Sequence, residues 1–312
     1  MAHPRKFRFG VQASNAASAT EWSALARKVE DLGYSSLFLP DHFGDQLHPV
    51  PAMMAAADAT TDLRVGALVF DNDYKHPVVL AKEMATIDVL SNGRVEFGLG
   101  AGWMTTDYEQ SGIPKERDGV RIAKMVEGLD VIRGLWAPGP FDYKGEHYTI
   151  NGLDGLPKPV QQPHPPILIG GGGPKMLRIA AQQADIVGVN PRLTAGEVNA
   201  EVAQDARASV IDEKVGWIRD AAGDRFDDLE LNILVFFGTI TDDARGFAEN
   251  MAGMFQLSPD EVLDIPYAWF GTVDGICDKL RGIRERWGVS YFVLQKDVMD
   301  AMAPVVAQLA GT

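Results

Sequence analysis

The chain has 312 residues, of which 46% are hydrophobic and 23% charged, which is usual for a globular protein with one large core or two smaller ones. Its 43 acidic and 29 basic residues give a net charge of −14, which repels nucleic acids and anionic membranes, so neither is an expected partner. No apolar segment follows the basic start "MAHPRKFRFGV" and no apolar run approaches the length of a membrane span, so we expect a soluble, cytoplasmic protein.

Short apolar runs alternate with amphipathic segments along the first half of the chain. Strands are predicted at 7–11, 36–40, 64–70 and 95–100, and helices in "EWSALARKVEDLG", "HPVVLAKEMATIDVLSNG" and "RIAKMVEGLDVIRGLW". Gly33 and the Asn92-Gly93 pair are typical helix stops, and Pro77 suits a first helical turn. The pattern therefore predicts four strand-helix units before residue 137.

Residues 137–166 interrupt this alternation. They contain seven prolines and a predicted hairpin, "FDYKGEHYTI", which turns at Lys144-Gly145. The alternation resumes with strands at 167–170, 185–189, 229–238 and 291–295. Helices are predicted over 175–183, near 195–222, between 242 and 287, and in the terminal segment "AMAPVVAQLA". Cys277, the single cysteine, lies among apolar residues at helical spacing and is predicted to pack in the core.

Eight apolar strands with helical crossovers predict an α/β fold, a (β/α)8 TIM barrel with a Pro-rich hairpin insertion between the fourth and fifth strands. We expect one domain over residues 1–312, with an excursion at 137–166; an open doubly wound sheet is the alternative. In such a barrel the site lies at the C-terminal ends of the strands. The residues there are 12–15, Asp41, His42, Asp71, Asn72, Asp73, Ala101, Gly102, Trp103, 170–173, Asn190, Gly238, Gln295 and Lys296.

Four glycines stand at a strand-to-helix junction in "PILIGGGGPKM": Gly170, Gly171, Gly172 and Gly173. Each costs about 0.5–1 kcal/mol relative to alanine, which suggests that a ligand must approach the backbone closely. A helix N-terminus carries about half a positive charge and binds phosphate readily, so we predict a phosphate site; a plain tight turn is the alternative. The pattern is neither GxxxxGK[ST] nor GxGxxG, which disfavours nucleoside triphosphate and dinucleotide sites.

His42 follows the second predicted strand, where it could transfer a proton near neutral pH; a structural hydrogen bond is the alternative. Adjacent strand residues point to opposite faces, so Asp41 need not contact it. In "GLGAGW", Gly100 and Gly102 permit close approach of a flat ligand. Trp103 could form a hydrophobic wall or only cover the barrel mouth.

Two other functions carry less weight. The histidines at 48, 76, 147 and 164 lack the spacing of a metal site, so no metal is expected. Lys296, in "QKD", would suit a Schiff-base aldolase, although a solvated charge is the commoner outcome for such a lysine.

Four segments together resemble the bacterial luciferase-like superfamily, and most of all its coenzyme F420-dependent oxidoreductases: "GYSSLFLPDHF", "HPVVLAKEMATIDVLSNGRVEFGLGAGW", "RIAKMVEGLDVIRGLW" and "PPILIGGGGPKMLRIAAQQADIVGV". The resemblance covers residues 7–190 well and 266–295 weakly. It implies a (β/α)8 barrel whose mouth holds a tricyclic deazaflavin. It places the ring near His42, Val69, Phe70, Asp71, Asn72, Gly100, Ala101, Gly102 and Trp103 and the phosphate at Gly170, Gly171, Gly172 and Gly173. Asp41 and Met176 are further expected cofactor-binding residues, and Lys175 and Arg178 are candidates for binding the acidic tail.

The resemblance also implies a reaction, namely hydride transfer between F420 and a carbonyl, imine or activated alkene, with His42 donating or accepting a proton or orienting the substrate. Some members carry a non-proline cis peptide bond after the third strand, here expected within residues 69–71. Trp103 stands where F420-dependent glucose-6-phosphate dehydrogenase has a catalytic acid, so that enzyme's sugar phosphate chemistry is not carried over.

Two alternatives to this reaction stay open. One is an FMN-dependent luciferase-like monooxygenase served by a separate enzyme that reduces the cofactor, and the other is a flavin-free barrel that binds a phosphorylated ligand or acts as an aldolase through Lys296. A small-molecule substrate is expected in each case, and a homodimer is usual among the proteins that the chain resembles.

Overall fold

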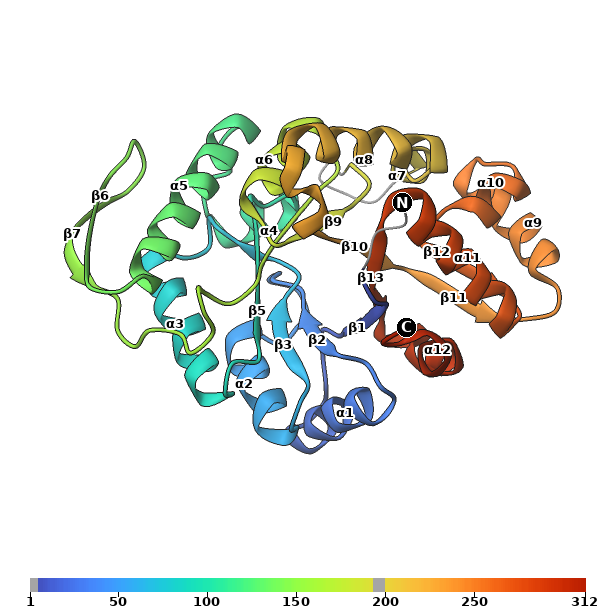
Figure 1. The fold of residues 1–312 in the computed structure, drawn as a ribbon, viewed down its shortest axis with the longest axis horizontal. Coiled ribbons are helices and arrows are strands. Elements are labelled where there is room, and N and C mark those ends of the chain that lie inside the picture. The colour runs from blue at the N-terminus through green and yellow to red at the C-terminus, as the bar shows by residue number, and fades with distance from the viewer. Residues whose placement is uncertain (1–4, 193–199) are drawn as a thin grey trace. The chain divides into compact units, whose positions relative to one another are not determined.

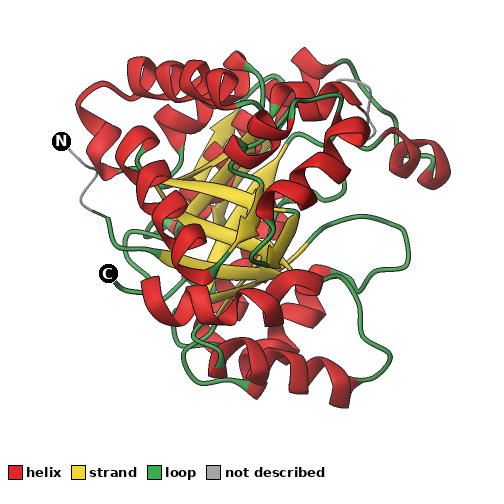
Figure 2. Cartoon of the chain, turned by 90° about the vertical axis from the view of Figure 1, so that its right-hand side faces the viewer, coloured by secondary structure: helices red, strands yellow, loops and turns green. Residues whose placement is uncertain are grey.

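The computed structural model describes residues 5–192 and 200–312, which form strands joined by helices (Figures 1 and 2). The strands of the main sheet are β1 (Arg8–Gln12), β2 (Ser36–Leu39), β3 (Arg64–Ala67), β4 (Phe70–Asp71), β5 (Val95–Gly100), β8 (Ile167–Gly171), β9 (Ile186–Val189), β10 (Glu230–Val235) and β13 (Val289–Gln295). Their order is β3-β2-β1-β13-β10-β9-β8-β5-β4, and β3 also pairs with β5. The sheet is therefore a closed parallel barrel, as predicted, in which β3 and β4 are two parts of the third strand.

The helices alternate with these strands along the chain. They are α1 (Ala19–Asp31), α2 (Pro49–Ala59), α3 (Pro77–Leu90), α4 (Thr105–Ser111), α5 (Asp118–Trp136), α6 (Pro174–Gln183), α7 (Ala200–Asp205), α8 (Ala208–Ala222), the 3₁₀ helix η1 (Gly223–Asp228), α9 (Ala244–Phe255), α10 (Pro259–Asp264), α11 (Val273–Trp287) and α12 (Lys296–Leu309). Part of the helix predicted near 195–222, residues 195–199, lies outside the described residues. In the described part of the chain, no helix is both long enough and apolar enough to cross a membrane.

Internal contacts group the chain into two compact units. The first unit comprises Met1–Ala13, Lys28–Ser36 and Ile169–Thr312, and the second comprises Ser14–Arg27 and Leu37–Leu168. The prediction of a single domain stays a prediction.

In the first unit, parallel strands pack on an aromatic core. β13 lies between β1 and β10, with Val293 in register with Gly10 and Phe292 with Ile233. The ring of Trp269 meets that of Phe292 edge to face at a centroid distance of 5.3 Å, and both side chains are fully buried. Cys277 is also fully buried, as predicted.

The prediction of a single strand over 229–238 is wrong at the C-terminal end of that range. The chain leaves the barrel at Phe236, whose amide donates to the Tyr267 carbonyl at 2.9 Å. It then forms β11 (Phe237–Ile240), which pairs in parallel with β12 (Ala268–Gly271), a strand that the pattern did not predict. Figure 1 shows β11 and β12 together with α9, α10 and α11.

In the second unit, the third barrel strand is interrupted at a cis peptide bond between Leu68 and Val69. The sequence placed this bond within 69–71, so the expected position was wrong by one residue. Both parts of the strand pair with β5, through Val65 opposite Val95 and Phe70 opposite Leu99. The third strand thus pairs with β5 on both sides of the cis peptide bond.

The proline-rich excursion belongs to the second unit and carries the predicted hairpin, formed by β6 (Pro140–Lys144) and β7 (Thr149–Asp154) beside α5 (Figure 1). The carboxylate of Glu127 on α5 accepts three backbone amides of the hairpin turn, from residues 146, 147 and 148. Asp88 on α3 is fully buried and accepts the amides of Val160 and Gln161 at 2.8 and 3.0 Å. The excursion is therefore fixed at its hairpin turn and again near its C-terminal end.

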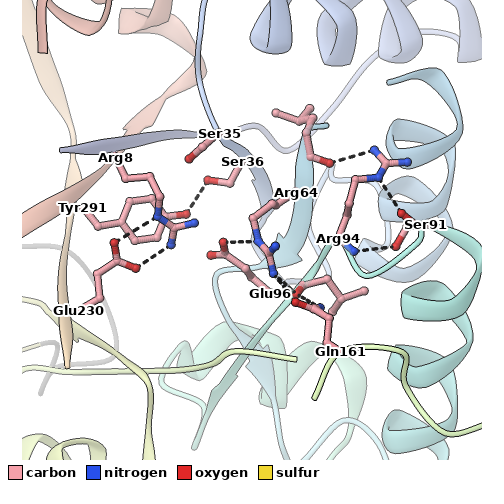
Figure 3. A network of polar contacts seen from close by, with 12 residues as sticks. Arg8, Ser35, Ser36, Arg64, Ser91, Arg94, Glu96, Gln161, Glu230 and Tyr291 are labelled. Carbon is pink, nitrogen blue, oxygen red and sulfur yellow. Dashed lines mark hydrogen bonds and ion pairs between the residues drawn. The ribbon is translucent and has the colours of Figure 1, made fainter. Parts of the chain in front are cut away.

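Polar clusters stand near the N-terminal ends of strands in each unit (Figure 3). In the first unit, Arg8 forms an ion pair with Glu230 at 2.8 Å and its guanidinium stacks on Tyr291. In the second unit, Arg64 pairs with the buried Glu96 at 2.7 Å. Residues at this end of barrel strands generally serve stability, so the candidate site is sought at the other end.

Candidate functional site

His42 follows β2 in the second unit and is held by a carboxylate. Its Nδ1 lies 2.6 Å from Oδ2 of Asp107, which is the third residue of α4. The His42 side chain is 17% exposed and that of Asp107 only 6% exposed. An ionised carboxylate only accepts hydrogen bonds, so Nδ1 carries the ring proton and Nε2 is the nitrogen left to exchange a proton.

Asp107 holds more than the histidine. Its Oδ2 also accepts the Tyr74 hydroxyl at 3.1 Å, and its Oδ1 accepts the Phe43 amide at 3.2 Å. Burial, together with nearby Asp71 and Asp107, raises the pKa of Tyr74, so this phenol stays a neutral donor. Trp103 meets the His42 ring edge to face at 5.5 Å. One carboxylate thus fixes the ring's tautomer and its orientation.

A second group of carboxylates surrounds Tyr108, the residue after Asp107. The Tyr108 hydroxyl lies 2.9 Å from Oδ2 of Asp71 and 3.2 Å from Oδ2 of Asp73. Asp73 also forms an ion pair with Lys124 of α5 at 2.7 Å. The backbone amide of Asp71 donates to the carboxylate of Asp41 at 3.1 Å. The C-terminal ends of β2 and β4 and the helix α4 are therefore joined by buried side chains.

Burial raises the pKa of Asp71 to about 6, and its neighbours Asp73 and Asp41 add to the rise, while hydrogen bonds from the Asp73 amide and from Tyr108 oppose it. Burial also raises the pKa of Asp41. Asp71 and Asp41 therefore hold their protons to a higher pH than carboxylates in water do.

The loop after β5 is tied to the same group. Arg121 donates to the carbonyls of Ala101 and Gly102 at 2.8 and 2.5 Å. Gly102 has φ of +72°, and a Cβ there would lie 1.9 Å from the Tyr108 hydroxyl and 2.2 Å from Asp71. Only glycine therefore fits at this position, because the chain's own side chains approach its backbone; the approach of a flat ligand here stays a prediction.

The predicted ring-binding residues of the second unit differ in exposure. Val69, Ala101, Gly102 and Trp103 are half-buried. Phe70 is buried, and the centroid of its ring lies 6.2 Å from that of Phe97, so its side chain belongs to the core. Asn72 is buried and donates to the Tyr148 hydroxyl of the excursion at 3.1 Å. Gly100 lies against Val69, since a Cβ on it would be 2.7 Å from Cγ2 of that residue.

The glycine-rich loop lies in the first unit, between β8 and α6. Gly173 is the N-cap of α6, no side chain caps the amides of the first turn, and Pro174 follows. A Cβ on Gly173 would meet nothing within 4 Å, whereas one on Gly172 would lie 2.6 Å from the backbone of Pro191 and Arg192. Gly172 is therefore required by packing, and the space before Gly173 is open to a ligand.

Around this loop the predicted residues are exposed or half-buried. Lys175 and Arg178 are exposed, and Met176 packs against Gly171, since a Cβ on that glycine would lie 2.6 Å from Cβ of Met176. The buried ammonium of Lys214 donates to the Asn190 carbonyl at 2.7 Å and pairs with Asp205. Lys296 is the first residue of α12 and not part of a strand, so it does not occupy the position that a Schiff-base barrel lysine needs.

The sequence did not single out Asp107, Tyr108, Arg121 or Lys124. The segment "TTDYEQS" has no apolar period that would have predicted α4. Asp107 is also 65 residues from His42, so nothing in the local pattern links the two.

The fold and this arrangement place the chain among parallel barrels with their functional groups at the C-terminal ends of the strands. The model of the luciferase-like monooxygenase family matches residues 5–218, and the chain belongs to that family. The prediction of the luciferase-like superfamily is therefore confirmed.

Its relatives use two different cofactors. The chain is 30% identical over 168 residues to an F420-dependent glucose-6-phosphate dehydrogenase of Amycolatopsis mediterranei, covering 51% of this chain and 50% of that protein. It is 27% identical over 226 residues to an FMNH2-dependent dimethylsulfone monooxygenase of Pseudomonas putida, covering 67% and 61%. The chain thus matches about half to two thirds of the length of these relatives. These similarities support a flavin-like cofactor class.

Solved structures share the fold over nearly the whole chain. An F420-dependent secondary alcohol dehydrogenase in complex with an F420-acetone adduct superposes with a TM-score of 0.78 over 98% of this chain and 99% of its own, at 19% identity. At this identity the similarity establishes the barrel fold alone.

Proposed function

We propose that the protein is an oxidoreductase that transfers a hydride between coenzyme F420 and a small carbonyl, imine or activated alkene. The observation that carries the proposal is His42, whose Nδ1 is held by the buried Asp107 at 2.6 Å so that Nε2 can exchange a proton. The relative of Amycolatopsis mediterranei supports F420 in particular.

The residues present fit such a cofactor. The uncapped amides at the start of α6 suit a phosphate, and the open space at Gly173 leaves room for it. In the second unit, the half-buried Val69, Ala101 and Trp103 offer apolar and backbone surface to a flat ring. Bound F420 supplies or accepts a hydride, and the lack of the flavin N5 disfavours oxygen chemistry.

The chain's own part is proton transfer and positioning. In the direction of carbonyl reduction, the substrate carbon gains the hydride while His42 gives a proton from Nε2 to the substrate oxygen, and the product is an alcohol. Asp107 stabilises the imidazolium before the proton leaves and keeps the ring in place afterwards. The reverse reaction returns the proton to Nε2.

The test is parallel titration of the protein with F420 and FMN, followed by turnover of ketones, imines and enones with reduced F420. We expect tighter binding of F420, and weaker binding of it by Gly173→Val, whose fold should be unaffected because nothing lies within 4 Å of its Cβ position. Gly282→Ala, a change in α11 with equally open surroundings, is the control. Tight FMN binding without F420 binding would contradict the proposal.

A second candidate is an FMN-dependent monooxygenase, which the Pseudomonas putida relative favours. Oxygen consumption with reduced FMN and a separate flavin reductase would distinguish it from hydride transfer.

A further inference from the structure

Tyr108 poses a problem of hydrogen counting. Its hydroxyl has one proton, yet it lies within hydrogen-bond distance of two carboxylate oxygens, Oδ2 of Asp71 at 2.9 Å and Oδ2 of Asp73 at 3.2 Å. Ionised carboxylates only accept hydrogen bonds. If both carboxylates were ionised, the hydroxyl could donate to only one of them. The other contact would bring two hydrogen-bond acceptors together in a site where Tyr108 is only 2% exposed. An additional proton resolves the conflict.

The surroundings decide which carboxylate holds that proton. Asp73 has a cation, because Lys124 lies 2.7 Å from its Oδ1. Asp71 has neutral partners, namely the Asp73 amide at 2.9 Å on Oδ1 and the phenol on Oδ2, and it is 6% exposed. Burying a charge without a counter-charge is costly, so the proton belongs on Asp71.

The other charged groups around this cluster do not change the assignment. Asp41, after β2, contacts the Asp71 amide and adds negative charge. The guanidinium of Arg121 lies 3.5 Å from the Tyr108 hydroxyl, but Nη1 makes shorter hydrogen bonds to the Ala101 and Gly102 carbonyls and Nη2 pairs with Asp118. The raised pKa of Asp71, about 6, is consistent with a proton held there.

We propose that Asp71 carries this proton and donates it to the Tyr108 oxygen, that Tyr108 in turn donates to Asp73, and that this chain holds α4 so that Asp107 meets His42. Asp71 and Tyr108 are thereby positioning residues for the hydride transfer proposed above, on which this role rests. When the proton is lost, Tyr108 can satisfy only one carboxylate. Because Asp107 is the neighbour of Tyr108 on α4, the contact between Asp107 and His42 then loosens.

The Asp71→Asn variant tests the proton itself, because the side-chain amide donates to Tyr108 and accepts the Asp73 amide as a protonated carboxyl group does. In infrared difference spectra, the wild type should show a carboxylic acid C=O band that disappears as pH rises through about 6, and Asp71→Asn should lack the contribution of Asp71 to this band. Asp45→Asn, a change at an exposed acidic residue of the same unit, should retain the band. A wild-type spectrum without that band would overturn the proposal.

The positioning role is tested by ¹⁵N NMR of the His42 ring. The Nδ1–H signal should be sharp at pH 5.5 and broaden by pH 8 in the wild type, whereas in Asp71→Asn it should change only with the loss of the Nε2 proton, a change that both proteins share. Equal pH dependence in the two proteins would show that the proton does not position α4. Neither measurement requires the cofactor or turnover, so these results stand apart from any failure of the proposed function.

Discussion

Replacing Asp107 with asparagine should reverse the tautomer of His42 while the fold stays intact. Oδ1 of Asp107 accepts the Phe43 amide at 3.2 Å, and Oδ2 contacts His42 Nδ1 at 2.6 Å and the Tyr74 hydroxyl at 3.1 Å. The single amide oxygen must face Phe43, because a backbone amide only donates. The NH2 group then faces Nδ1, which has to become an acceptor, and the ring proton moves to Nε2.

The magnitude follows from the bonds that are exchanged. Tyr74 can rotate its hydroxyl to accept, so Asp107→Asn keeps every partner but replaces charge-assisted hydrogen bonds with neutral ones, at a cost of about 1–3 kcal/mol in the free energy of unfolding. Turnover should fall by about 10²–10⁴-fold, because the imidazolium loses its counter-charge and the neutral ring presents the wrong tautomer. Cofactor affinity should change little.

The assay is steady-state turnover of an accepted substrate with reduced F420, combined with ¹⁵N NMR of the His42 ring and urea denaturation. Glu109→Gln is the matched control, since it removes the same charge from an exposed position on α4. Turnover by Asp107→Asn close to that of the wild type, with the ring proton shown on Nε2, would refute the role assigned to the tautomer.

Three further predictions, which involve four variants, test the structure by urea denaturation. Gly172→Ala should lower the free energy of unfolding by about 1–3 kcal/mol, because its Cβ would lie 2.6 Å from backbone atoms, whereas Gly173→Ala should stay within about 0.5 kcal/mol of wild type; equal stabilities would contradict the packing difference. Asp88→Ala removes the acceptor of three N–H groups of the excursion, although Gln161 Nε2 still donates to the Val95 carbonyl, so it should lower the free energy of unfolding by about 1–3 kcal/mol in total and speed proteolysis of the excursion; unchanged cleavage would show that other contacts hold it. Lys279→Met leaves the partly buried carbonyls of residues 263, 265 and 268 without their ammonium donor and should lower the free energy of unfolding by a similar amount; a neutral result would mean that water replaces the ammonium group.

The barrel strands were predictable because they are buried on both faces. Every residue of β5 and β2 is buried, so these strands read as runs that are apolar except at Ser36 and Glu96 and are bounded by turns. The same signal misled at 229–238, where Phe236 and Phe237 continue the run of apolar residues after β10 but are 40% and 42% exposed. Apolar composition alone does not reveal where a strand leaves its sheet.

The candidate site was predictable only in part. His42 and the glycine run could be singled out, because each follows a strand and belongs to a residue type with a specific chemistry. Asp107 could not, because its role depends on a contact across 65 residues of sequence and on a short polar helix. Tyr108 is missed for the same reason, since a tyrosine in a polar segment carries no sign that two carboxylates flank it.

Buried carboxylates at the two ends of the strands in the second unit should respond in opposite ways to neutralisation. Near the N-terminal ends, Glu96 is 1% exposed and pairs with Arg64 at 2.7 Å, so Glu96→Gln leaves a half-buried cation without its counter-charge and should lower the free energy of unfolding.

At the C-terminal ends, the pKa of Asp71 is about 6 in the folded state and near 3.9 in the unfolded state. As pH rises between these two values, the unfolded state ionises first, so the free energy of unfolding falls. At pH 8 the full cost applies, and Asp71→Asn should raise the free energy of unfolding by about 2–3 kcal/mol. Urea denaturation of both variants at pH 8 tests whether the two changes shift the free energy of unfolding in opposite directions. If both changes lower stability, Asp71 serves the fold as Glu96 does. If only Glu96→Gln does, the chain keeps Asp71 at a cost in stability, which is the pattern that functional carboxylates show.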